Sequence, residues 1–263
     1  EIGSGLVGSE MCIRDRMKQS PLFSNIETGE AYYDDVERAT YKGICFKTFF
    51  LLGIAVIVAA ITAFYLPTII SSGNFGTFYI ALFVATIVGF ISVIVGRSSE
   101  RAAKYASFIY SVCEGLFLGC LTAICEDVLP GVSAIAIFST LVIFAIMLTL
   151  FATGILRVGN KFRKFCFGFA LGAIALILIT SIASVFIENV QTYLGMLALV
   201  ELFLLVYGVI TLSLNFAEAQ GVVEAGASKK AEWCVALGLM VSLVYIYVEI
   251  IRFLLVIAAS KRD

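Results

Sequence analysis

The chain has 263 residues, of which 61% are hydrophobic and 14% are charged, with a formal net charge of −1 and no histidine. A soluble domain carries about 25% charged residues, so this composition and a mean hydropathy of +1.03 exclude that class. The lack of histidine removes the commonest general base and metal ligand. The seven cysteines form no Cys-x-x-Cys pair that would indicate a zinc or redox site.

The first residues differ in kind from the rest of the chain. The stretch GLVGSEMCIRDR, within residues 1–16, resembles the conceptual translation of a transposon-based sequencing adapter, and it runs directly into Met17. We expect residues 1–16 to be an artefact of that kind. Residues 17–44 are polar and mixed in charge, without an apolar signal-peptide core, and we expect a cytoplasmic N-terminal tail there.

Seven apolar runs follow, each close to the ~20 residues that a helix needs to cross the bilayer core. Backbone polar groups in lipid must be satisfied within their own segment, so each run is expected to be a helix. Pro67 and the serine-glycine stretch after it are expected to end the first run, and the longest predicted loop is Asn215 to Glu232. The sequence thus predicts an all-α integral membrane protein with a transmembrane domain over 45–258 and a C-terminal tail over 259–263. The predicted spans are 45–66, 75–96, 105–125, 132–155, 165–187, 193–214 and 233–258.

Lysine and arginine indicate the orientation of these spans. Of the 18 basic residues, two belong to the adapter-like segment, 13 lie on the side of the N-terminus, and the three opposite loops contain none. The positive-inside rule therefore predicts a cytoplasmic N-terminus and, with seven spans, a C-terminus outside, although the terminal Lys261-Arg262 pair disagrees mildly. The thirteen are Lys18, Arg38, Lys42, Lys47, Arg97, Arg101, Lys104, Arg157, Lys161, Arg163, Lys164, Lys229 and Lys230.

Four ionisable side chains lie near the middle of predicted spans: Glu114, Glu201, Glu249 and Arg252. Each ionised group costs roughly 2.5–3.5 kcal/mol at the centre of a spanning helix, so we expect these groups to face one another, water or a cavity. Helical periodicity places each glutamate on a polar face. These faces contain Ser107 and Ser111 with Glu114, then Gly208, Thr211 and Asn215 with Glu201, then Gly238, Ser242 and Tyr245 with Glu249 and Arg252.

Two interpretations of these polar faces stay open. In the functional one, they form a protonatable cation site or a gated polar pathway. In the structural one, Glu249 and Arg252 pair along one helix, while the other glutamates stay protonated and hydrogen-bonded, as burial allows. A small-residue face on the third span, made by Gly115, Gly119 and Thr122, indicates close helix packing.

The residues also exclude several activities. Without histidine there is no serine–histidine protease pair and no zinc metalloprotease motif. None of the five aspartates lies inside a predicted span, so an intramembrane aspartyl protease is excluded, and the last span has no lysine to bind retinal. No phosphate-binding glycine motif is present. We therefore expect no enzyme activity, no resident cofactor and no binding of nucleic acid.

Several stretches carry a family resemblance. They are ATYKGICFKT before the first span, SVCEGLFLG in the third, IFAIMLTLFATGILRVGNKFRK across the fourth and the basic loop after it, and SKKAEW followed by ALGLMVSLVYIYVEIIRFL in the last. In this order and spacing they resemble the bacterial branch of the Bax inhibitor family, also called the transmembrane Bax inhibitor motif family. The resemblance covers about Ala39 to Leu255.

The resemblance implies a seven-helix bundle with the last helix at its centre. It also implies a pH-sensitive calcium leak, in which paired acids on helices six and seven sense protons and control opening. Glu249 matches the acid of helix seven, where calcium would make a transient contact. Helix six departs from the family pattern, because relatives carry Asp-Phe-Asp where this chain has Asn215, Phe216 and Ala217.

The leading hypothesis is a passive, pH-modulated leak of calcium or another cation across the bacterial plasma membrane. Glu249 is its expected pathway residue, Arg252 the neutralising partner, and Glu201, Glu114 and Asn215 further candidates. The alternative is a non-transporting regulator that binds other membrane proteins, such as a quality-control protease, and the helix-six departure favours it. A secondary transporter is a weaker third class, since the two halves of the chain show no repeat. The expected partners are thus the lipid bilayer, a cation and, in the alternative, another membrane protein.

Overall fold

The computed structural model describes residues 38–71, 75–152, 160–187 and 189–261. These residues contain seven α-helices and no β-strand, and each helix is long and apolar enough to cross a membrane. The predicted fold class, an all-α integral membrane protein with seven spans, is confirmed. The expectations for residues 1–37 fall outside the described residues. The helices are α2 (Tyr41–Ser71), α3 (Phe75–Ser98), α4 (Glu100–Val128), α5 (Val132–Ala152), α6 (Asn160–Phe186), α7 (Val190–Glu224) and α8 (Ala231–Ser260).

Two predicted boundaries are wrong. Pro67 lies inside α2, near its end: the helix loses the hydrogen bond that the proline cannot donate, yet it continues for one more turn to Ser71. Helix α7 continues through Asn215 to Glu224, so the predicted long loop shrinks to a short turn over residues 225–230. Gly226 reverses the chain in that turn with a φ of +62°, a conformation that favours glycine. The polar residues after Asn215 indicated a loop, but Glu218 and Glu232 pair with Arg97 of α3 and Lys47 of α2, and the exposed Glu224 ends α7.

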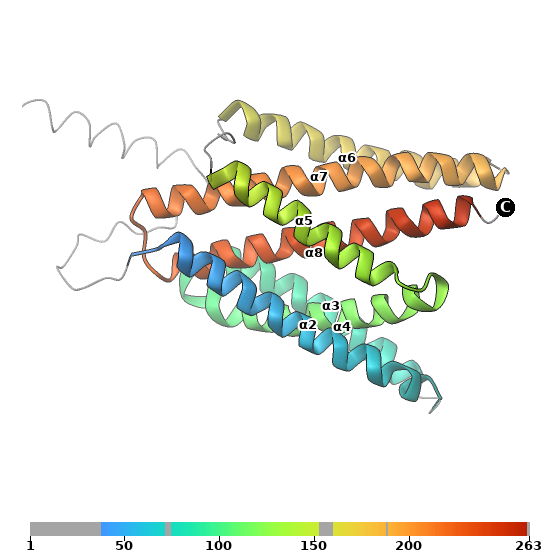
Figure 1. The fold of residues 1–263 in the computed structure, drawn as a ribbon, viewed down its shortest axis with the longest axis horizontal. Coiled ribbons are helices and arrows are strands. Elements are labelled where there is room, and N and C mark those ends of the chain that lie inside the picture. Colours follow the sequence, from blue (N-terminus) through green and yellow to red (C-terminus); the bar gives the residue numbers. More distant parts are fainter. Residues whose placement is uncertain (1–37, 72–74, 153–159, 188, 262–263) are drawn as a thin grey trace, which may run out of the picture.

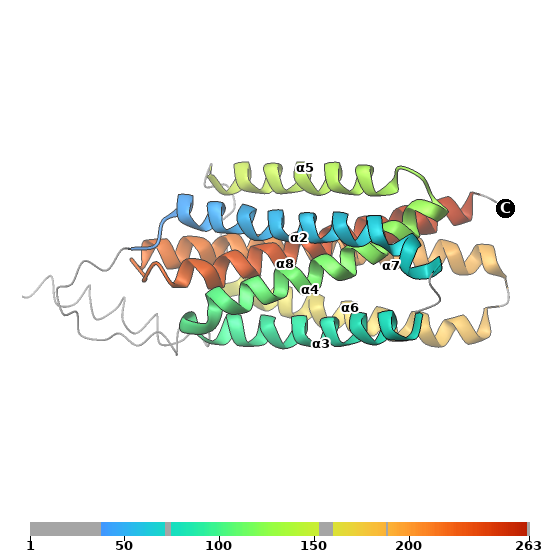
Figure 2. The same ribbon diagram turned by 90° about the horizontal axis from the view of Figure 1, so that it is seen from below.

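Helix α8 lies at the centre of the bundle. Figures 1 and 2 show it with α2 and α4 on one side and α7 on the other. It packs against α2, α3, α4, α5 and α7, whereas α6, within the described residues, packs on α7 alone. In the most apolar stretch of α8, 72% of the residues are buried, compared with 11% in α6. The last helix is therefore central, as the family resemblance implied.

Small residues allow α4 to approach α2 closely. A Cβ atom added to Gly115 would lie 2.7 Å from the carbonyl oxygen of Ala55, and one added to Gly119 would lie 2.5 Å from that of Ala59. Both distances are far below van der Waals contact, so only glycine fits at these two positions. The predicted small-residue face on α4 thus packs against the backbone of α2.

The chain enters α2 and turns from α7 into α8 at one end of the bundle, while the C-terminus lies at the other (Figure 1). Because the spans alternate in direction, the loops rich in lysine and arginine all lie at the first end, which we call the basic end. Arg157 and Lys18 fall outside the described residues. The sides of the bundle expose large apolar side chains such as Phe64, Val185 and Phe186, each more than 75% exposed. Such a surface is suited to lipid contact.

Candidate functional site

Glu201 of α7 and Glu249 of α8 meet where the two helices pack, and they share one cation. The Arg252 side chain donates from Nη2 to Glu201 Oε1 at 2.7 Å and from Nη1 to Glu249 Oε1 at 3.4 Å. Glu201 and Glu249 are only 3% and 2% exposed, whereas the Arg252 side chain is 49% exposed. The structure thus brings together three of the four intramembrane ionisable groups that the sequence singled out, and we call Glu201, Glu249 and Arg252 the shared-arginine site.

Each of the two carboxylates keeps one oxygen without a partner. Among the described residues, Glu201 Oε2 and Glu249 Oε2 are buried and accept no hydrogen bond. Tyr245, one turn before Glu249, lies beside the Glu249 carboxylate, and its hydroxyl donates to the carbonyl oxygen of Leu204 at 3.4 Å. Two ionised carboxylates around one guanidinium would leave an uncompensated negative charge, which is costly in a buried site. A proton or a second cation would remove that excess.

Asn215 belongs to a different cluster, nearer the basic end. Its Nδ2 donates to the carbonyl oxygen of Gly238 at 3.0 Å and to Ser242 Oγ at 2.5 Å, so it joins α7 to α8. Arg97, at the end of α3, donates to Glu218 of α7 at 3.0 Å. The bare backbone of Gly238 leaves room for the Arg97 guanidinium and for Asn215 Oδ1. Asn215 is about 21 Å from Glu201 along α7, since each residue adds 1.5 Å, and it takes no part in the shared-arginine site.

Glu114 also lies apart from the shared-arginine site. It lines a pocket between α3 and α4 together with Ala85, Thr86, Gly89, Cys113 and Phe117. Its carboxyl is in hydrogen-bonding contact with Tyr110, one turn earlier on α4. The sequence placed Glu114 at a depth similar to that of the other two glutamates, but its side chain lies toward α3, whereas Ser111 of the same predicted face contacts Met240 of α8.

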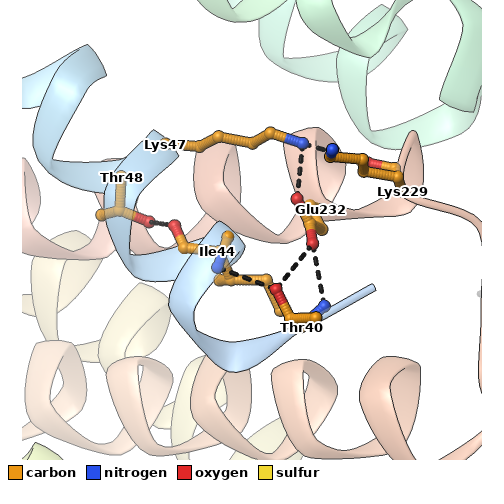
Figure 3. A network of polar contacts seen from close by, with 7 residues as sticks. Thr40, Ile44, Lys47, Thr48, Lys229 and Glu232 are labelled. Carbon is orange, nitrogen blue, oxygen red and sulfur yellow. Dashed lines mark hydrogen bonds and ion pairs between the residues drawn. The ribbon is translucent and has the colours of Figure 1, made fainter. Parts of the chain in front are cut away.

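Sequence reasoning missed a buried ion pair at the basic end. Figure 3 shows Lys47 of α2 reaching across to Glu232 at the start of α8, with their charged atoms 2.6 Å apart. It also missed the pair of Arg97 and Glu218, at 3.0 Å. In the sequence, Lys47 was visible as a lone charge just inside an apolar run, where a buried partner is required. That signal could have raised the question of a partner, but nothing in the sequence identified Glu232.

The chemistry of the shared-arginine site is that of a small cluster with two acids and one base. Carboxylate oxygens are the ligands that hard cations such as calcium prefer. The described residues contain no group of three or more side chains of the kind that holds a resident metal ion. Two carboxylates with a half-exposed arginine are compatible with brief binding of a cation, as conduction requires.

Comparison with known proteins gives one match. A family model described as "Bax inhibitor 1 like" matches residues 18–259, which is most of the chain. No curated protein and no solved structure matches significantly.

Proposed function

The chain belongs to the Bax inhibitor 1 like family, and from that premise we propose that it is a passive leak for calcium or another cation in the bacterial plasma membrane. The proposal requires no enzyme activity and no resident cofactor. The seven apolar helices are long enough to cross a membrane, as a leak protein must. The proposed cation pathway passes Glu201 and Glu249.

The observation that carries the proposal is the pair of buried oxygens, Glu201 Oε2 and Glu249 Oε2, that have no partner in the described structure. Buried acceptors are almost always satisfied, and those left over mark places where an ion, water or proton binds. The two carboxylates already share Arg252, which is half-exposed and can withdraw from them. A cation that approaches this pair would replace the guanidinium as the counter-charge. Protonation of either carboxyl would weaken cation binding, which supports modulation by pH.

We propose that the basic end of the bundle faces the cytoplasm. This orientation follows from the positive-inside rule, because the loops at the opposite end contain no lysine or arginine. The shared-arginine site would then lie in the outer half of the membrane. Labelling of single cysteines with a membrane-impermeant reagent in intact cells tests the orientation: a residue in the turn over 225–230 should stay unlabelled, and labelling there would reverse it.

The function is tested with purified protein in liposomes that contain a calcium reporter. Wild-type protein should admit calcium, and Glu249→Gln should reduce the rate by about tenfold or more, the factor that corresponds to ~1.4 kcal/mol. The matched control is Glu224→Gln, which alters an exposed glutamate at the end of α7. Equal flux from wild type and Glu249→Gln would contradict the role of Glu249, and no flux from any variant would contradict the leak itself.

A second candidate is a regulator that binds other membrane proteins without transport. It is favoured by Asn215, a neutral side chain whose amide nitrogen donates to Gly238 and Ser242 at a position where the family resemblance implies an acid. A neutral residue cannot titrate, so one half of the usual proton sensor is missing. Stable co-purification of a membrane partner together with absent calcium flux would support this candidate over the leak.

A further inference from the structure

The two halves of α8 are packed differently. Most of the residues from Ala231 to Ile246 are buried. From Arg252 to Ser260, by contrast, no residue is buried. If ions pass along α8, as the proposed function requires, the tightly packed half at the basic end must separate from its neighbours. The contacts that hold this half in place are therefore candidates for a closing device.

One set of polar contacts ties the first turn of α8 to the start of α2, and we call it the Glu232 clasp. It consists of Thr40 and Lys47 on one side and of Lys229, Glu232 and Trp233 on the other. Glu232, 1% exposed, accepts hydrogen bonds from Thr40 N at 2.8 Å, from Thr40 Oγ at 3.3 Å and from Lys47 Nζ at 2.6 Å. Lys47 Nζ also donates to the carbonyl oxygen of Lys229 at 3.0 Å and lies 4.8 Å from the centre of the Trp233 ring. Figure 3 shows the Glu232 carboxylate between Thr40 and Lys47.

The position of Glu232 is favourable for two helices at once. It lies in the first turn of α8, and its carboxylate also meets the N-terminus of α2 through the amide of Thr40. The N-terminus of a helix carries a partial positive charge, so a carboxylate stabilises both helix starts. The clasp therefore keeps the two helix ends together by charge as well as by hydrogen bonds.

The backbone around the clasp is fitted to it. Gly43 of α2 lies directly against the Glu232 carboxylate, so closely that a Cβ atom there would overlap it. Just before α2, the amide of Ala39 donates to the carbonyl oxygen of Ala227 at 2.9 Å, and Arg38 and Ser228 form an isolated antiparallel bridge. The segment that leads into α2 is thereby fixed to the turn between α7 and α8.

From these contacts we propose that the Glu232 clasp is a closing contact: it holds the basic-end half of α8 against α2 and keeps that half of the bundle shut. Glu232 and Lys47 are then positioning residues, because they act through the placement of α8 and not on the ion. The proposal rests on the proposed leak function for its transport consequence. Its conformational part, the separation of α8 from α2, can be measured without any transport.

The test uses the reactivity of Cys234, which lies on α8 two residues after Glu232 and is partly buried. In full-length protein whose other cysteines are changed to serine or alanine, the rate of reaction with a water-soluble maleimide reports opening of the basic end. Gly43→Ala pushes the clasp apart without a change of charge, and Lys47→Met removes the counter-charge. Both should raise the labelling rate of Cys234 by about tenfold, the factor that corresponds to ~1.4 kcal/mol lost from the closed state.

The chain offers matched controls for both variants. Gly53→Ala makes the same change on α2 where nothing lies within 4 Å of the new Cβ atom. Lys42→Met removes an exposed lysine of the same helix. Both controls should label at the wild-type rate. Thermal unfolding in detergent is measured for every variant, so that a misfolded protein is recognised. If a variant misfolds, Glu232→Gln, which keeps the acceptor for Thr40, serves as a milder second variant.

The outcomes separate the closing contact from the leak. Faster Cys234 labelling together with faster calcium entry into liposomes supports both proposals. Faster labelling with no calcium entry from any variant supports the closing contact and contradicts the leak. Unchanged labelling in folded Gly43→Ala and Lys47→Met overturns the closing contact, whatever the calcium flux shows.

Discussion

Helix α8 carries a buried glutamate toward each end, and the two differ in how their oxygens are satisfied. At the basic end, Glu232 accepts from Thr40 and Lys47 and uses both of its oxygens. Toward the other end, Glu249 accepts from Arg252 at a long 3.4 Å and lies beside Tyr245 and Glu201, and its second oxygen accepts no hydrogen bond in the described structure. Burial is almost the same, at 1% and 2%. The comparison teaches that unsatisfied acceptors, and not burial, distinguish an acid that is free to bind from one that holds the fold.

The largest predicted effect is a difference in stability between variants of the two glutamates. Glu232→Ala removes a fully paired buried acid and strands Lys47, so we expect the free energy of unfolding to fall by about 3 kcal/mol or more. Glu249→Ala removes an acid that is poorly paired, and the loss should be about 1 kcal/mol. Unfolding of the purified variants in detergent micelles, followed by circular dichroism, measures both. Equal losses would show that the two glutamates are structural to the same degree.

A second prediction concerns the cation that the two unsatisfied carboxylates share. Arg252→Gln removes the guanidinium from Glu201 and Glu249, so the protein should lose about 2 kcal/mol at neutral pH in the absence of divalent ions. Millimolar calcium should then restore much of the loss, because it can take the place of the arginine between the carboxylates. The same calcium concentration should stabilise wild type far less. Thermal unfolding with and without calcium, in buffer without magnesium, measures this effect. If calcium leaves the stability of Arg252→Gln unchanged, there is no cation site here.

The control for that experiment is Glu114→Gln. Glu114 faces the pocket between α3 and α4 and is separate from the shared-arginine site. The calcium response of Arg252→Gln should therefore be the same with and without the Glu114 change, within about 0.5 kcal/mol, as expected for independent positions. Loss of the response in the double variant would show that the two sites are coupled.

The part of the site that could be predicted from the sequence was the part that lies along one helix. Steps of three and four residues placed Glu249 and Arg252 on one face, and the cost of charge in lipid required a partner such as Glu201. The clasp could not be predicted, because Lys47 and Glu232 are far apart in the chain and meet only through the packing of α2 on α8. The helix that covers Glu114 could not be predicted either, since periodicity gives the face on which a residue lies but not the neighbour that packs on that face.

The smallest predicted effect concerns Asn215, which lies between the two glutamates of α8 in depth. Arg97 Nη1 is buried without a partner in the described structure, and it lies with Asn215 Oδ1 against Gly238. Asn215→Asp therefore loses the hydrogen bond to Gly238 but places a charge near this guanidinium, and the two effects should cancel to within about 1 kcal/mol. In an Arg97→Gln background the compensation disappears, and the same change should cost ~2 kcal/mol. Unfolding of the four proteins in the cycle gives the coupling energy. A cost that does not depend on Arg97 would mean that this arginine serves Glu218 alone and that the acid of helix six cannot be restored by a single substitution.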